Sequence, residues 1–436
     1  MRKFRDLLRH DLVHNALALY GVQACRKILP LISIPYLARV LRAEGWGTVA
    51  FVSSLGEFMV LTIEFGFNLS ATREIAQHRD SRALCGRIVS GVIASQILLA
   101  AVAVIAVLLV QSHLPVLNNN HALLWAGLLY GVFQGLNPIW FFQGLENIQL
   151  AAAIEIVGKV LAVSGLFIFV RTPDDQWQVL ALQAFPAMLS TGAGFWLAMR
   201  RVDLCWPDIA LVRQTVKRSW PMFLFRSAES LYGVGNAFVL GLFASPAAVG
   251  YFSMAERISR AIYGLMDPIR EAVYPRLSNL IEKSREKAAH LAQIGSVLMI
   301  AGGLVLGLGI YVLAPLVIRL AGAGSFKPAV TVLRIFALLP PLLSVTHSVG
   351  VQWLLSQGRE GIVNRIMLGA GIVNLTLAAI LAPRFAQYGM AWAVVCAETI
   401  VCICVVLVVR RVAPFWSRRP EAMLGTLAEP VSGRID

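Results

Sequence analysis

Residues 88–110 read IVSGVIASQILLAAVAVIAVLLV, and no side chain in this run is charged. At 1.5 Å per helical residue the segment is about 35 Å long, which is enough to cross the hydrocarbon core of a bilayer, about 30 Å thick. A membrane-spanning strand would be shorter and would alternate polar and apolar residues, and this run does neither. The segment therefore predicts a transmembrane α-helix.

Similar apolar runs recur along the whole chain. Of its 436 residues, 58% are hydrophobic and only 14% are charged, and the mean hydropathy is +0.70. No water-soluble domain needs so much apolar surface. We predict an all-α polytopic membrane protein with twelve spans, near residues 14–38, 46–67, 88–110, 121–143, 150–170, 177–199, 219–243, 247–275, 291–318, 329–356, 361–382 and 388–409.

The net charge of +14 is explained by the loops between these spans. Most Lys and Arg residues fall in short segments next to the membrane, where the positive-inside rule and anionic lipids account for them, so no nucleic-acid partner is expected. Counting them predicts that both termini are cytoplasmic and that residues 413–436 form a polar, disordered cytoplasmic tail. The six cysteines lack zinc-ligand spacing, so we expect neither a metal nor a cofactor.

An internal repeat divides the chain in two. Residues 41–51, LRAEGWGTVAF, correspond to residues 243–252, FASPAAVGYF, and a shift of 203 places Gly47 on Gly250. Residues 142–146, FQGLE, correspond to 356–360, SQGRE, with a shift of 214. Each half contributes six helices in the same orientation, which is typical of transporters built from parallel repeats with a pseudo-two-fold axis along the membrane normal. We predict an N-terminal six-helix bundle over residues 1–205 and a C-terminal one over 206–412.

The eighth span carries charge that lipid does not tolerate. Residues 251–275 read YFSMAERISRAIYGLMDPIREAVYP, and most of the charged residues share one helical stripe. An ionised side chain at the bilayer centre costs roughly 3 kcal/mol, so this stripe is expected to face protein or a watery cavity. A simpler interpretation is that salt bridges such as Glu256 to Arg260, four residues apart, only hold helices together.

Spans 1, 2 and 7 also carry charge, and the first two helices of each half are expected to line a central cleft. Planar guanidinium groups suit phosphate oxygens, so an anionic head group is the expected ligand. The candidate substrate-binding residues are Arg26, Lys27, Arg226, Arg257, Arg260 and Arg270. Four carboxylates are expected either to pair with these cations or to carry a proton, because desolvation favours the neutral carboxyl group: Glu57, Glu64, Glu229 and Asp267. We predict no catalytic residue. Tryptophans near span ends, among them Trp46, Trp140 and Trp353, are expected to anchor the protein at the membrane interface.

The chain resembles Wzx-type polysaccharide repeat-unit flippases of bacterial envelopes at residues 66–76, GFNLSATREIA, at 140–146, WFFQGLE, and at 357–360, QGRE. That superfamily also contains the multidrug and toxin extruders and the lipid II flippases. The resemblance implies a V-shaped pair of bundles in the bacterial inner membrane that moves an undecaprenyl-pyrophosphate-linked oligosaccharide, for O-antigen or exopolysaccharide synthesis, from the cytoplasmic to the periplasmic leaflet. By similarity, Arg26, Lys27, Arg226, Arg260 and Arg270 are candidates to hold the pyrophosphate. Membrane lipids, a polysaccharide polymerase and a chain-length regulator are the candidate partners.

Two alternatives remain open from the residues alone. A multidrug extruder of the same superfamily would favour an acidic, aromatic cavity for cations, and the surplus of arginine argues against it. A membrane-embedded glycan polymerase or ligase would need a sizeable external loop for its acceptor, and the largest predicted one, near residues 111–121, is short and uncharged.

Overall fold

The computed structural model of the protein describes the backbone of residues 2–146, 148–233 and 235–412. Side chains are described for residues 32–411, except for 147–152, 225, 228, 229, 231–234, 282 and 323. Throughout these residues the regular structure is helical, and no strand occurs. The predicted tail, 413–436, lies outside the described residues, and the boundary near residue 205 stays a prediction.

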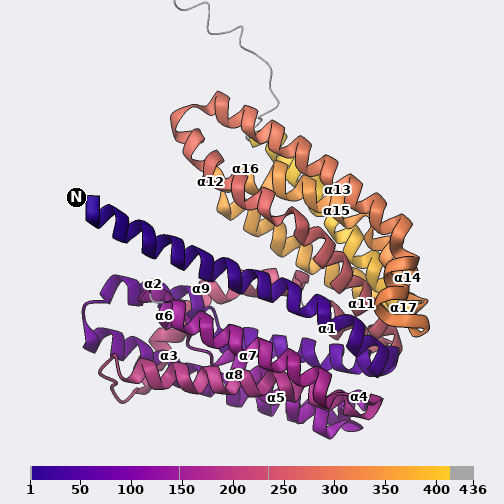
Figure 1. Ribbon diagram of the computed structural model, residues 1–436, viewed down its shortest axis with the longest axis horizontal. Helices are drawn as coiled ribbons and strands as arrows, with labels where there is room; N and C mark the ends of the chain where they lie inside the picture. The colour runs from indigo at the N-terminus through magenta and orange to yellow at the C-terminus, as the bar shows by residue number, and fades with distance from the viewer. Residues whose placement is uncertain (1, 147, 234, 413–436) are drawn as a thin grey trace, which may run out of the picture.

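The N-terminal bundle comprises helices α1 to α8 (Figure 1). Helix α1, Arg2–Glu64, contains two spans, because the backbone leaves the helical region at Arg42 (φ 56°, ψ −173°) and reverses there. The next spans are α3, Arg82–Val110, and α5, His121–Gly135, which continues as α6, Ile139–Gly144. Helices α7, Ile148–Phe169, and α8, Gln176–Met199, complete the bundle; α2, Phe67–His78, and α4, Pro115–Asn118, are short connecting helices.

The C-terminal bundle comprises helices α9 to α17. Its first span is α9, Ile209–Gly233, with α10, Asn236–Phe243, and its second is α11, Pro246–Tyr263, with α12, Asp267–Lys283. Helix α13 is Arg285–Gly322. The following span is built from four consecutive pieces: α14, Ala329–Phe336; α15, Leu339–Val345; a π-helical turn at Thr346–Val351; and α16, Gln352–Ser356. Helix α17, Glu360–Val412, again contains two spans, with a reversal at Ala386 (φ 47°).

The predicted fold class is confirmed: within the described residues the helices form twelve crossings in two six-helix bundles. Seven described helical segments are long and apolar enough to be recognised as spans by length and composition alone. The number is smaller for three reasons. Helices α1 and α17 each hold two crossings, charges lower the hydropathy of α9, α11 and α12, and the fully described part of α7, residues 153–169, is too short. The eighth span, predicted as one helix, is interrupted by a 3₁₀ turn at Gly264–Met266.

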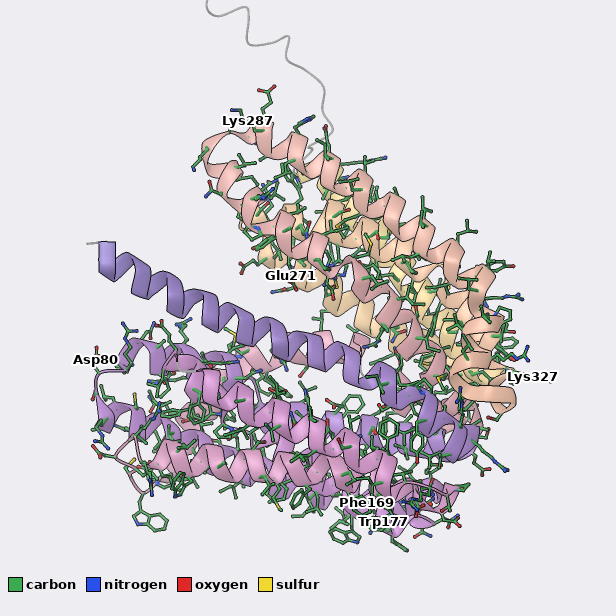
Figure 2. The ribbon with its side chains drawn as sticks, in the orientation of Figure 1. Asp80, Phe169, Trp177, Glu271, Lys287 and Lys327 are labelled. Atoms are coloured by element: carbon green, nitrogen blue, oxygen red, sulfur yellow. The ribbon has the colours of Figure 1, made fainter. Side chains whose placement is uncertain are left out.

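The two bundles meet at one end and diverge toward the other, which gives the molecule a V shape (Figure 1). Phe169, Trp177 and Lys327 lie toward the closed end, whereas Asp80 and Lys287 lie at the open ends of the two bundles (Figure 2). The N-terminal part of α1 runs along the opening between the bundles (Figure 1). We call these regions the closed end and the open end.

The two repeat-related glycines make the closed end. A Cβ atom added to Gly47 of α1 would overlap the carbonyl oxygen of Pro246 and stand 2.7 Å from the backbone nitrogen of Gly250. A Cβ atom on Gly250 would overlap the carbonyl oxygen of Ala43. Backbone therefore packs directly on backbone across the pseudo-two-fold axis, which is the close approach that only glycine permits.

Side chains close the same end around the glycines. The Trp46 indole Nε1 donates a hydrogen bond to Ser253 Oγ over 2.9 Å, and Arg39 donates to the Leu320 carbonyl oxygen over 2.8 Å, each from one bundle to the other. The expectation of interfacial anchoring is wrong for Trp46, Trp140 and Trp353, which are 3%, 1% and 0% exposed. Trp140 and Trp353 lie inside the bundles and Trp46 lies between them, so none of the three indoles faces the membrane interface.

Candidate functional site

Two of the predicted cations are held by carboxylates on their own span. The Arg260 guanidinium lies 2.9 Å from Glu256 Oε1 on α11, and Arg270 lies 2.7 Å from Asp267 Oδ1 on α12. These are neighbours at i,i+4 and i,i+3 on one helix face. Arg260 nevertheless keeps 55% of its side-chain surface exposed.

A third cation is paired from one bundle to the other. Arg226 on α9 lies 3.2 Å from Glu64 Oε2 at the end of α1, and the same oxygen accepts a hydrogen bond from Asn68 Nδ2 over 3.4 Å. Both partners are partly exposed, at 36% and 24%. Beside this pair, the Phe65 and Phe223 rings stack with centroids 4.3 Å apart, so α1 and α9 pack together around an accessible ion pair.

Arg257 differs from these three cations. It lies eleven residues after Pro246, about 16 Å along α11 at 1.5 Å per residue, and so about halfway through a hydrocarbon core of about 30 Å. Its guanidinium carbon stands 5.0 Å from the centroid of the Trp46 ring, a cation–π contact. Among the side chains that the structure describes, none forms an ion pair with Arg257.

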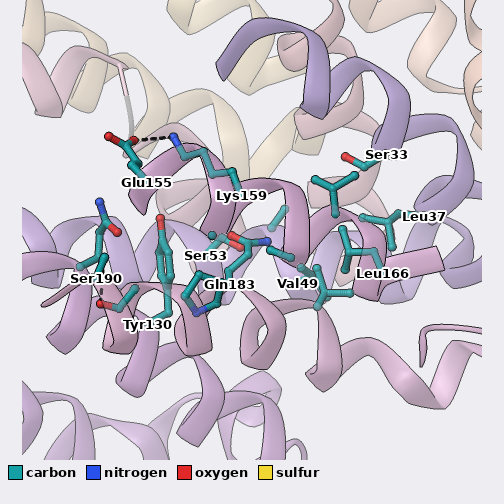
Figure 3. Close-up of a pocket in the computed structure, with 18 of the residues that line it drawn as sticks. Ser33, Leu37, Val49, Ser53, Tyr130, Glu155, Lys159, Leu166, Gln183 and Ser190 are labelled. Carbon is teal, nitrogen blue, oxygen red and sulfur yellow. Dashed lines mark hydrogen bonds and ion pairs between the residues drawn. The ribbon is translucent and has the colours of Figure 1, made fainter. Parts of the chain in front are cut away.

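Arg257 also borders a cavity inside the N-terminal bundle (Figure 3). The cavity has a volume of about 300 Å³ and lies between α1, α5, α7 and α8. Apolar residues such as Leu37, Val49 and Leu166 line part of it. Its polar lining includes Ser33, Ser53, Tyr130, Gln134, Asn137, Glu155, Lys159, Gln183 and Ser190. Arg257 is the lining residue that comes from the C-terminal bundle, so the cavity borders the space between the bundles.

The carboxylates near this cavity already have partners. Glu155 Oε1 lies 2.8 Å from Lys159 Nζ, one helical turn away on α7 (Figure 3). Glu57 Oε1 accepts a hydrogen bond from the Tyr130 hydroxyl over 2.8 Å. Arg26, Lys27 and Glu229 belong to helices α1 and α9, but their side chains lie outside the described residues, so their roles stay predictions.

Buried polar groups also hold the C-terminal bundle together. Glu398 is 1% exposed, and its Oε1 accepts a hydrogen bond from Thr346 Oγ1 over 2.8 Å, at the start of the π-helical turn. Asn374 donates to Asn236 Oδ1 over 2.9 Å, and Asn236 donates to Glu256 Oε1 over 3.3 Å. This chain connects α17 through α10 to the charged face of α11.

Sequence reasoning missed the amides of the cavity, because it followed charge alone. Gln134 and Asn137, three residues apart, share a face of the fourth span, and Gln183 and Ser190, seven apart, share a face of the sixth. This helical spacing of polar residues in otherwise apolar spans was the available signal.

Two six-helix bundles related as parallel repeats, with charge turned inward at mid-membrane depth, define a polytopic transporter. Comparison with solved structures agrees: the chain is similar to "Lipid II flippase MurJ, inward closed conformation", with a TM-score of 0.72 and 14% identity, covering 91% of this chain and 87% of that one. It is also similar to an inward-facing multidrug resistance MATE family transporter, with a TM-score of 0.63 and 16% identity, covering 88% of this chain and 97% of that one. At these identities the likeness shows the fold.

The sequence comparisons give the family. Residues 12–281 match the family described as "Polysaccharide biosynthesis protein", and the chain belongs to it. A curated relative from Escherichia coli (strain K12), named "Putative O-antigen transporter", is 30% identical over 410 residues, covering 92% of this chain and 97% of the relative. A relative of the same name from Shigella dysenteriae is 27% identical, covering 89% of this chain and 97% of the relative.

Proposed function

We propose that the protein is a flippase that moves an undecaprenyl-pyrophosphate-linked oligosaccharide repeat unit from the cytoplasmic to the periplasmic leaflet of the bacterial inner membrane. The family, the name of the curated relatives and the fold shared with a lipid II flippase support this function. The observation that carries it is Arg257, a mid-membrane cation with no ion-pair partner among the described side chains. Arg257 is also exposed, so its guanidinium can contact an anion that enters the space between the bundles.

The pyrophosphate supplies that anion. It would enter at the open end, which we propose to face the cytoplasm, and be held by Arg257 together with Arg226, Arg260 and Arg270. Guanidinium groups bind phosphate oxygens through paired, charge-assisted hydrogen bonds, and the carboxylates now holding three of these arginines would limit the cost of the empty state. The prenyl chain would remain in lipid, because its transfer into a polar space is unfavourable.

Translocation then requires the V to invert. The bundles, which we propose to be residues 1–205 and 206–412, would separate at the Gly47–Gly250 contact while the open end closes. No covalent bond of the glycolipid has to break in this cycle, so the protein acts as a transporter and not as an enzyme. The surplus of arginine suits an anion better than the cationic substrates of a multidrug extruder.

A reconstituted system tests this proposal. Vesicles containing the purified protein and a fluorescent undecaprenyl-pyrophosphate oligosaccharide are scored for transfer of the head group away from an external quencher. A charge-assisted hydrogen bond is worth about 2 kcal/mol, so Arg257→Gln should slow transfer by roughly thirtyfold. Arg384→Gln, an exposed arginine beside the Ala386 reversal, is the matched control and should not change the rate. Equal transfer by wild type and Arg257→Gln would remove Arg257 from the site, and no transfer by folded wild type would refute the flippase.

A further inference from the structure

The cavity inside the N-terminal bundle has a chemistry that binding of a pyrophosphate does not require. We propose that it is a saccharide subsite, which binds the sugar ring directly attached to the pyrophosphate of the glycolipid. This inference rests on the proposed function, since it names the part of that substrate which the arginines do not recognise.

Two amide side chains in the cavity wall do not contribute hydrogen bonds to the fold. Among the residues that the structure describes, the side chains of Gln134 and Gln183 make no hydrogen bond. Two other glutamines in the spans do: Gln96 donates to the Gly135 carbonyl oxygen over 3.0 Å, and Gln352 to the Arg270 carbonyl oxygen over 3.1 Å. Both side chains are half-buried and border the cavity, so the Gln134 and Gln183 amides are available to an occupant of the cavity.

The cavity lining also combines several types of group. A sugar ring offers hydroxyl groups that both donate and accept, together with apolar C–H faces. The cavity supplies amides, the hydroxyl groups of Ser53 and Ser190, and the aromatic side chains of Trp46 and Tyr130. A site of mostly apolar walls with a few directed polar groups is the usual form of a small-molecule site. A prenyl chain would offer no partner to the Gln134 and Gln183 amides, whereas the hydroxyl groups of a sugar ring would.

The size of the cavity limits the occupant to the innermost part of a glycan. Its volume of about 300 Å³ is at the lower end of the range for small-molecule sites. It corresponds to about ten water molecules at roughly 30 Å³ each. A pyranose ring with its hydroxyl groups has a similar number of heavy atoms, so one ring fits and a longer glycan has to extend into the space between the bundles.

The position of the cavity connects it to the phosphate-binding cation. Trp46 and Arg257 both line it, and the guanidinium carbon lies 5.0 Å from the indole centroid. A sugar bound against Trp46 would thus carry its anomeric phosphate toward Arg257. Among the described lining residues the one carboxylate is Glu155, and it is paired with Lys159, so this part of the lining has no surplus negative charge that would favour a cation.

Binding to the purified full-length protein in nanodiscs tests the subsite. The first probe is the lipid-linked repeat unit extracted from a host strain that lacks this protein. The second is undecaprenyl pyrophosphate without a glycan, the stripped lipid, prepared separately. Wild type should bind the glycan-bearing lipid at least tenfold more tightly than the stripped lipid. The double variant Gln134→Leu, Gln183→Leu should lose that preference while its affinity for the stripped lipid stays within twofold of wild type.

The matched control is Gln77→Leu, the same exchange at an exposed position of α2 outside the cavity, which should keep the full preference. If the double variant does not fold, Gln183→Met is used alone and should reduce the preference at least threefold. A preference that survives in the folded variants overturns the subsite but leaves the flippase intact. Failure of wild type to bind either lipid overturns both proposals, whereas equal binding of both lipids overturns only the subsite.

Discussion

Replacing Gly47 with valine should force the closed end apart. In the structure a Cβ atom on Gly47 would overlap the Pro246 carbonyl oxygen and lie 2.7 Å from Gly250 N, and neither neighbour is a flexible side chain. Both are helix backbone, so the strain cannot be relieved by a rotamer change, and α1 and α11 must separate by about 1 Å or more. The expected result is loss of the conformation in which the bundles touch at this end.

The size of the effect follows from the cost of overpacking. Added methyl groups in a well-packed interior cost typically about 1–3 kcal/mol. At 1.4 kcal/mol per factor of ten, this lowers the population of the closed conformation by about 5- to 150-fold relative to one in which the glycines are apart. Transport should fall as well, because a cycle that alternates between two states needs both to be populated.

Chemical accessibility measures this shift directly. Val249, 1% exposed at the closed end, is replaced by cysteine in a background without other cysteines, and labelling by a membrane-impermeant maleimide is followed from the side that we propose to be periplasmic. Labelling should be slow with Gly47 intact and several-fold faster with Gly47→Val. Gly192→Val is the matched control, because a Cβ atom at Gly192 of α8 meets nothing within 4 Å. Unchanged labelling in a folded Gly47→Val protein would refute the argument that the glycine contact closes this end.

Substitutions at three further positions test the packing of the bundles. Glu64→Gln breaks the partly exposed pair with Arg226 and should change the free energy of unfolding by no more than about 1 kcal/mol, measured by thermal melting in detergent; a loss of several kcal/mol would show that the pair holds the bundles together. Glu398→Ala removes the acceptor of the buried Thr346 hydroxyl and should lower the free energy of unfolding by about 1–3 kcal/mol. Glu398→Gln retains an acceptor oxygen and should melt closer to wild type. Trp140→Ala, at a side chain that is 1% exposed, should cost about 3–5 kcal/mol, and a melting temperature close to wild type would contradict its place in the core.

The sequence was sufficient for the architecture because hydropathy and repetition are local signals. Each run such as 88–110 must cross the membrane whatever its neighbours do, and the shift of 203 that aligns Gly47 with Gly250 needs no knowledge of contacts. The contact between these two glycines was not predicted. It depends on how the two repeats meet in space, which each repeat alone does not encode.

The candidate site was predicted only in part, because charged residues stand out in an apolar sequence, whereas uncharged polar residues such as glutamine do not. The structure shows Arg226, Arg260 and Arg270 with carboxylate partners and Arg257 beside a cavity; which of them contacts substrate stays a prediction. Gln134 was overlooked because a single amide in an apolar span is usually satisfied within the fold, as the Gln352 amide is by the Arg270 carbonyl oxygen. Recognising an unsatisfied amide requires its neighbours on other helices.

The single-residue reversals at Arg42 and Ala386 leave two connections at the closed end with almost no loop. Proteases and inserted epitope tags need several residues of extended, exposed chain, and these reversals do not provide them. A stretch of that kind occurs instead at the open end of the N-terminal bundle, between α8 and α9, where Trp206 is 97% exposed. Val202 is buried and the Asp203 and Cys205 N–H groups are hydrogen-bonded to α3, so tags for topology mapping and binders for imaging are best directed at the exposed chain around Trp206.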